Sequence, residues 1–216
     1  LRSEWYRNSQ KIIPFESIFQ HFNEESLSWW YMDDGNLKQD KDKPQKVILS
    51  TDSFTKRENL QLICFLNDKF NLTFRLDKQN RIILYDQYQI HNFLHLVTPF
   101  IHQSMHRKTI KSYTFKFPSM PRRTTIYLPA AIDLPSPTKD INEELNNGLE
   151  IIKKDFKNGI FYRNYQSDIL EMKTQFESKP YQIIINENNL EILFFLKSVT
   201  GLTFSQLSGL CFKISK

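Results

Sequence analysis

The first hundred residues alternate between helix signals and hairpin signals, and this order restricts the fold more than any other feature of the sequence. Residues 23–32 begin with a capping asparagine and two acidic residues before an apolar run, which predicts a helix that Gly35 ends. Residues 36–39 and 46–51 flank a polar loop, and the second stretch is short and β-branched. We therefore predict a hairpin directly after the first helix.

The same order then repeats along the chain. Residues 55–58 form a capping box, and apolar residues continue with helical spacing as far as Phe70. Residues 73–77 and 81–85 alternate polar and apolar residues around a turn, which predicts a second hairpin. Another helix follows and ends at Pro99. The predicted order is helix, hairpin, helix, hairpin, helix, which is an α+β arrangement.

The chain changes character after Pro118, where prolines become frequent. We predict a domain over residues 1–118, a basic and proline-rich linker or wrapping arm over residues 119–138, and an extension of unknown role over residues 139–216. The extension is predicted to be mostly helical, with one strand at residues 181–185.

Composition narrows the class of partner. The net charge of +5 favours a polyanion, although a solvated basic surface is the alternative. Cys64 and Cys211 lie in apolar runs, which predicts buried, reduced thiols in an intracellular protein. We expect no membrane partner, because no apolar stretch approaches the length of a membrane-spanning helix, and we see no signal peptide. The first residue is Leu1, so we expect a fragment or a processed piece of a longer chain.

The segment Leu27–Gly35 ends an apolar helix with two adjacent carboxylates, Asp33 and Asp34. A carboxylate at the C-terminal end of a helix faces the negative end of the helix dipole, and two neighbouring carboxylates repel each other. A divalent cation offsets both penalties, and Mg²⁺ prefers such oxygen ligands together with water and phosphate. An ordinary turn after a helix is the alternative interpretation.

This segment resembles the nine-residue LAGLIDADG motif, in the form in which a tryptophan, an aromatic residue, a methionine and two aspartates precede the glycine. Residues 5–14 are similar to the segment that leads into a second motif copy in two-motif chains of the family. Residues 46–55 resemble the strand and helix start that follow the motif, and residues 96–108 resemble the closing helix with its basic residue. The resemblance covers residues 1–118 and does not extend to residues 119–216.

The resemblance implies the fold of a LAGLIDADG homing endonuclease half-saddle. In that fold, of order αββαββα, a four-stranded antiparallel sheet lies on DNA and carries helices on its other face. Asp34 would be the catalytic carboxylate and the ligand of Mg²⁺, and Asp33 would support the structure around it. Lys108 would stabilise the pentacoordinate phosphate or tune a water molecule. Trp29 departs from the founding motif, which has a glycine there, and implies wider or differently rotated packing of paired motif helices.

Outward-facing residues of the predicted sheet would contact the double-stranded DNA, with a solvated sheet face as the alternative. These residues are Lys38, Lys46, Ser50, Arg75, Asp77 and Arg81. Residues 98–132 contain no acid and six cations, among them Arg107 and Lys111, which suits contact with phosphates or a solvated basic loop. The histidine pairs 91/95 and 102/106 have a spacing that can bind a metal, but chance on a helix face explains them better.

Cleavage of two strands needs two active sites, and the sequence contains one motif. We therefore expect a second LAGLIDADG half, supplied either by a missing N-terminal half or by another subunit. The predicted function is site-specific, metal-dependent cleavage of double-stranded DNA in a bacterial or phage cytoplasm or an organelle matrix. Two alternatives stay open: an intron RNA maturase that assists splicing, and a catalytically inactive DNA-binding protein of the same fold.

Overall fold

The computed structural model describes residues 2–8, 10–41, 43–110, 123–174 and 177–215. The chain divides into two compact units, Leu1–Tyr113 and Thr114–Lys216, and each is described by itself.

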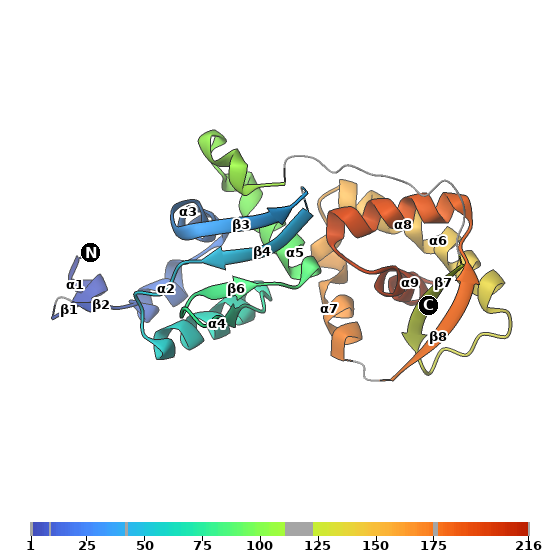
Figure 1. Cartoon of the computed structure of the whole chain (residues 1–216), viewed down its shortest axis with the longest axis horizontal. Helices are drawn as coiled ribbons and strands as arrows, with labels where there is room; N and C mark the ends of the chain where they lie inside the picture. Colours follow the sequence, from blue (N-terminus) through green and yellow to red (C-terminus); the bar gives the residue numbers. More distant parts are fainter. Residues whose placement is uncertain (1, 9, 42, 111–122, 175–176, 216) are drawn as a thin grey trace. The chain divides into compact units, whose positions relative to one another are not determined.

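The first unit is built on an antiparallel sheet whose four strands follow the order β3-β4-β6-β5 (Figure 1). The strands are β3 (Gly35–Asp40), β4 (Lys43–Leu49), β5 (Arg75–Leu76) and β6 (Ile82–Leu84). Strand β3 pairs with β4 to form the first hairpin, and β5 pairs with β6 to form the second. Pairing of β4 with β6 joins the two hairpins into one sheet.

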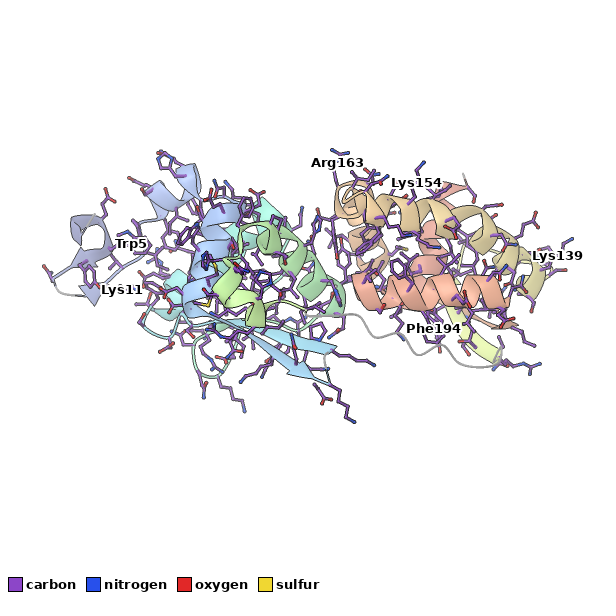
Figure 2. All side chains as sticks on the ribbon, turned by 90° about the horizontal axis from the view of Figure 1, so that it is seen from above. Trp5, Lys11, Lys139, Lys154, Arg163 and Phe194 are labelled. Carbon is purple, nitrogen blue, oxygen red and sulfur yellow. The ribbon has the colours of Figure 1, made fainter. Side chains whose placement is uncertain are left out.

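Three helices cover one face of this sheet: α3 (Glu24–Asp34), α4 (Lys56–Phe70) and α5 (Gln87–Val97). The view from above places these helices on one side of the strands (Figure 2). Their apolar side chains meet Val47, Leu49, Ile82 and Leu84 of the sheet in a single buried cluster. The predicted order αββαββα and the α+β fold class are therefore confirmed.

Local signals explain where these helices begin. Asn23 accepts a hydrogen bond from the N–H of Ser26 at 2.9 Å and caps α3. The capping box predicted at residues 55–58 is present at the start of α4. Asp86 caps α5 by accepting from the N–H of Gln89 at 3.0 Å.

The sequence did not predict several short elements that flank this core. The lead-in contains α1 (Arg2–Trp5), β1 (Tyr6–Arg7), β2 (Gln10–Lys11) and, after Pro14, α2 (Phe15–His21). Two 3₁₀ segments, η1 (Thr98–Phe100) and η2 (Gln103–Lys108), follow α5. Helix α2 is held to α4 by aromatic contact, with the ring centroids of Phe19 and Phe65 separated by 5.1 Å.

The second unit combines a two-stranded antiparallel sheet with four helices. The strands are β7 (Arg123–Pro129) and β8 (Ser178–Ile184), and the helices are α6 (Pro137–Lys157), α7 (Phe161–Thr174), α8 (Glu187–Thr200) and α9 (Phe204–Ile214). Helix α9 lies at the centre, where Leu207, Leu210 and Cys211 are fully buried. The extension is mostly helical, as predicted.

Two expectations differ from the structure. Residues 123–129, inside the predicted linker, form strand β7 and pair with β8, because alternate residues such as Ile126 and Leu128 have a core to bury against. Cys64 is exposed, whereas Cys211 is buried as expected, so the prediction of two buried thiols was wrong for Cys64. Cys64 lines an open surface groove with Leu60 and Gln61 of α4, although its sequence neighbours are apolar.

The described part of the chain contains no single helix with the length and apolar character needed to cross a membrane. Helices α8 and α9 meet that test only when they are taken together across a bend of 106°.

Candidate active site

The two adjacent carboxylates lie where α3 passes directly into β3. The N–H of Gly35 bonds to the carbonyl of Tyr31 and closes the helix, and Gly35 is also the first residue of the strand. The N–H of Ser50, at the end of β4, donates to the carbonyl of Asp34 at 3.0 Å. The main chain of Asp34 is thus held where α3, β3 and the end of β4 meet.

The side chains of Asp33 and Asp34 are exposed. None of the ion pairs found among the described residues involves either carboxylate. Two neighbouring negative charges therefore stand at the C-terminal end of α3 without a salt-bridge partner in that part of the chain, and their mutual repulsion favours binding of a further cation.

Lys108 lies beside these carboxylates, but its ammonium group is already engaged. Nζ donates to the carbonyl of Tyr31 at 3.0 Å and to the carbonyl of Met32 at 2.6 Å. Burial lowers the pKa of Lys108 from its ordinary value, and the charge of Arg107 acts in the same direction. The carboxylates of Asp33 and Asp34 oppose both effects, which places Lys108 within their electrostatic reach.

A cavity of about 260 Å³ adjoins Asp34. Its walls come from the lead-in, α2, α3, α4 and the loop before α4: Trp5, Lys11, Ile13, Ile18, Phe22, Trp30, Asp34, Phe54, Leu62, Phe65 and Leu66. Lys11 and Asp34 are the charged members of this lining, and Nζ of Lys11 lies 5.0 Å from the centroid of the Phe54 ring. Figure 2 shows Lys11 next to Trp5 on the lead-in.

Lys11 was not among the predicted site residues. It lies in residues 5–14, which resemble the segment that leads into a second motif copy. A hydrogen bond from the main chain to a side chain anchors this segment: the N–H of Ile13 donates to Oε1 of Glu58 at 3.0 Å. Burial acts to raise the pKa of Glu58, but the hydrogen bonds from Thr55 and Ile13 outweigh it and hold that pKa below its ordinary value.

The six predicted sheet residues share the face that the helices leave open. Val47 and Leu49 point into the helical core, so Lys46 and Ser50, which alternate with them, point to the other face. Lys38 lies directly opposite Lys46, and Arg75 lies opposite Ile83. Like charges directly opposite each other destabilise a sheet, so the Lys38 and Lys46 pair favours an anionic partner.

Asp77 and Arg81 differ from the other four because they bind each other. Arg81 donates through Nε and Nη2 to Oδ2 of Asp77 at 2.9 and 2.7 Å. Oδ1 of Asp77 accepts from the N–H groups of Gln79 and Arg81, so both side chains stabilise the β5–β6 turn. Because Asp77 and Arg81 bind each other, Lys38, Lys46, Ser50 and Arg75 are the four predicted sheet residues whose side chains are more readily available to a partner.

The remaining basic residues are less well placed. Arg107 is exposed, and its Nη1 contacts the carbonyl of Ser104 at 3.4 Å. Lys111 lies outside the described residues. The ring of His102 caps η2 by accepting from the N–H of Ser104.

The carboxylates around Asp34 suit a metal ion that also binds water and phosphate, rather than an ion surrounded entirely by protein ligands. Within the described ranges, no group of three or more histidine, cysteine, aspartate or glutamate side chains could hold an ion. Mg²⁺ is commonly bound through one or two carboxylates, with water and phosphate completing its octahedral shell. Asp34 with Asp33 beside it matches that chemistry.

Known proteins match the first part of the chain. Residues 1–93 match the model of the LAGLIDADG DNA endonuclease family. This part of the chain is therefore similar to the LAGLIDADG DNA endonuclease family.

Named relatives align with about half of the chain. A probable intron-encoded endonuclease 1 from Wickerhamomyces canadensis is 36% identical over 108 residues, which cover 48% of this chain and 46% of the relative. A cytochrome b mRNA maturase bI2 from Debaryomyces hansenii is 30% identical over 112 residues, covering 50% of this chain and 40% of the relative. A solved structure of the homing endonuclease I-WcaI bound to its DNA recognition sequence matches with 33% identity and a TM-score of 0.42, covering 48% of each chain. The chain thus spans less than half the length of these relatives.

Proposed function

We propose that this chain supplies one catalytic half of a metal-dependent, site-specific endonuclease that cuts double-stranded DNA. One observation carries the proposal: in a domain similar to this family, Asp34 stands exposed at the helix-to-strand junction without a salt-bridge partner among the described residues. Such an arrangement is stabilised when a cation binds.

Asp34 is the proposed ligand of Mg²⁺, with Asp33 adding negative charge beside it. The bound ion would polarise the scissile phosphate and activate water. Lys11 has an exposed ammonium group in the same cavity as Asp34, so we assign to it the contact with the negatively charged phosphate. Lys108 is already bonded to two carbonyl groups, which makes it a poorer candidate for that contact than the sequence predicted.

The open sheet face is the proposed DNA surface. Lys38, Lys46 and Arg75 would neutralise phosphates or read base edges in the major groove, and Ser50 would add a hydrogen bond. These side chains follow the same face as far as the end of β4, where Ser50 is bonded to Asp34. Sequence reading and cleavage would then occur on one continuous surface.

A second LAGLIDADG half completes the enzyme in this proposal. Trp29, near the middle of α3, has 64% of its surface exposed, whereas Leu27 and Tyr31 of the same helix are fully buried. An exposed tryptophan in such a position favours an apolar partner surface. We propose that the complete enzyme acts inside the cell, in a bacterial or phage cytoplasm or an organelle matrix.

A selection experiment tests this function. Random duplex DNA would be enriched for binding by the chain, and the enriched half-site would then be placed in inverted repeat so that two copies of the chain can meet. We expect Mg²⁺-dependent nicking of the single half-site and cutting of both strands in the repeat. Absence of nicking and cutting in Mg²⁺ would contradict the proposal.

An RNA maturase is the second candidate, because one relative carries that name. The same selection with a library of structured RNA separates the two. Preferential binding of RNA, without cleavage of any selected DNA, would support the maturase.

A further inference from the structure

Tyr31 and Lys108 are joined by reciprocal hydrogen bonds at the catalytic end of α3. The hydroxyl of Tyr31 donates to the carbonyl of Lys108 at 2.7 Å, and Nζ of Lys108 donates back to the carbonyls of Tyr31 and Met32. We call these three bonds the Tyr31–Lys108 clasp. It connects residues 77 apart in sequence and closes η2 onto the last turn of α3.

The clasp is buried and strongly directional. Tyr31 is fully buried, and Lys108 is 9% exposed. The last carbonyls of a helix lack partners within the helix and carry its negative partial charge, so an ammonium group satisfies both needs there. Leaving either group unpaired would be costly in this buried position, and the three bonds therefore hold each other in place.

Asp33 and Asp34 follow the clasped residues directly. We propose that Tyr31 and Lys108 are positioning residues that fix the last turn of α3, so that the carboxylates of Asp33 and Asp34 are preorganised for a divalent cation. This inference rests on the proposed metal-dependent function. It gives Lys108 a role through the main chain, in place of the action on the phosphate or on a water molecule that the resemblance implied.

Two roles for Lys108 lead to opposite expectations. If Lys108 acts only as a positive charge near the carboxylates, its removal should strengthen cation binding, because one competing cation is gone. If it positions the carboxylates, its removal should weaken cation binding, because the last turn loses its anchor.

The experiment measures binding of Mn²⁺ alone to the full chain by NMR. Mn²⁺ is a paramagnetic cation that takes the same oxygen ligands as Mg²⁺. Trp5 and Trp30 line the cavity beside Asp34, so their indole N–H signals report bound Mn²⁺ by broadening. In the unmodified chain we expect both signals to broaden, and Asp34→Asn should abolish that effect.

Tyr31→Phe removes one hydroxyl and leaves the charge and the ring unchanged. We expect half-broadening at about fivefold higher Mn²⁺, the scale of one net hydrogen bond. Lys108→Met should shift it in the same direction. Tyr165→Phe is the matched control, because it removes a hydroxyl that donates to Asp155 at 2.9 Å in the second unit and should leave Mn²⁺ binding unchanged.

The outcomes separate the clasp from the proposed function. Unchanged Mn²⁺ binding in Tyr31→Phe, or tighter binding in Lys108→Met, overturns the clasp while the metal site stands. If Asp34→Asn still binds Mn²⁺ as the unmodified chain does, or if the unmodified chain binds none, the metal site of the proposed function fails and the clasp fails with it. Should Lys108→Met not fold, Tyr31→Phe alone decides.

Discussion

Substituting Gly35 by alanine should strongly destabilise the first unit, although the backbone of Gly35 has φ −90° and suits any residue. The limit is space. A Cβ atom at position 35 would lie 2.8 Å from Cε2 of Tyr31 and closer still to Cδ2 and the carbonyl oxygen of the same residue. Real Cβ atoms do not approach other atoms this closely, so part of the structure must move.

Tyr31 has little freedom to move away. Its ring is fully buried, lies edge-on to Phe93 with 5.0 Å between centroids, and carries a hydroxyl bonded to Lys108. Overpacking a tight core costs about 1–3 kcal/mol, and we expect the upper end here because a backbone carbonyl is also displaced. A loss of about 3 kcal/mol lowers the melting temperature of a domain this size by about 12 °C.

Calorimetry on the full chain measures this effect. The matched control is Gly209→Ala in the second unit, whose Cβ would meet Sδ of Met172 at 2.8 Å. A flexible methionine can turn aside, so this change should cost below about 1 kcal/mol. If Gly35→Ala melts with the unmodified chain, the close packing of Tyr31 on the motif glycine is refuted.

Three further predictions concern the partner surface, the DNA surface and the lead-in. Trp29→Ala should change the free energy of unfolding by less than about 0.5 kcal/mol in denaturant titration but weaken pairing with a second half, and a large loss of stability would contradict its surface position. Lys46→Ala should reduce the slope of log affinity against log salt by about one in DNA-binding titrations, whereas Arg81→Ala, whose guanidinium is bonded to a carboxylate, should leave that slope unchanged; equal effects would refute the distinction. The lowered pKa of Glu58 contributes stability that is present above the ordinary carboxyl pKa of 4.5 and is lost as pH falls through the lower folded pKa. The loss of stability on acidification should therefore be shallower in Glu58→Gln than in the unmodified chain. Identical acid unfolding curves for the two would argue against the bond to Ile13.

The core of the first unit could be predicted because its signals are local. Asn23, the capping box at residues 55–58 and Asp86 each mark a helix start by a bond within three residues. Strand β7 could not be predicted in this way. Its partners in β8 lie 49 to 61 residues later, and its nearby prolines resemble those of a linker.

The candidate site was predicted only in part, for a similar reason. Asp34 could be identified because a dipole argument applies to any helix end, and the motif reinforced it. The engagement of Lys108 with carbonyls of α3 depends on contacts across 76 and 77 residues. Lys11 reaches the cavity of Asp34 through the fold of the lead-in, which has no strong periodic pattern. The bond between Asp77 and Arg81 was in principle visible from their spacing around a turn.

The most direct measurement is the cleavage rate of the selected duplex by the unmodified chain and by Asp34→Asn, with Mg²⁺ in excess and DNA affinity measured alongside. We expect Asp34→Asn to bind the duplex at least as tightly as the unmodified chain and to leave both strands intact. Cleavage by Asp34→Asn at the unmodified rate would show that the reaction does not depend on a cation at the end of α3.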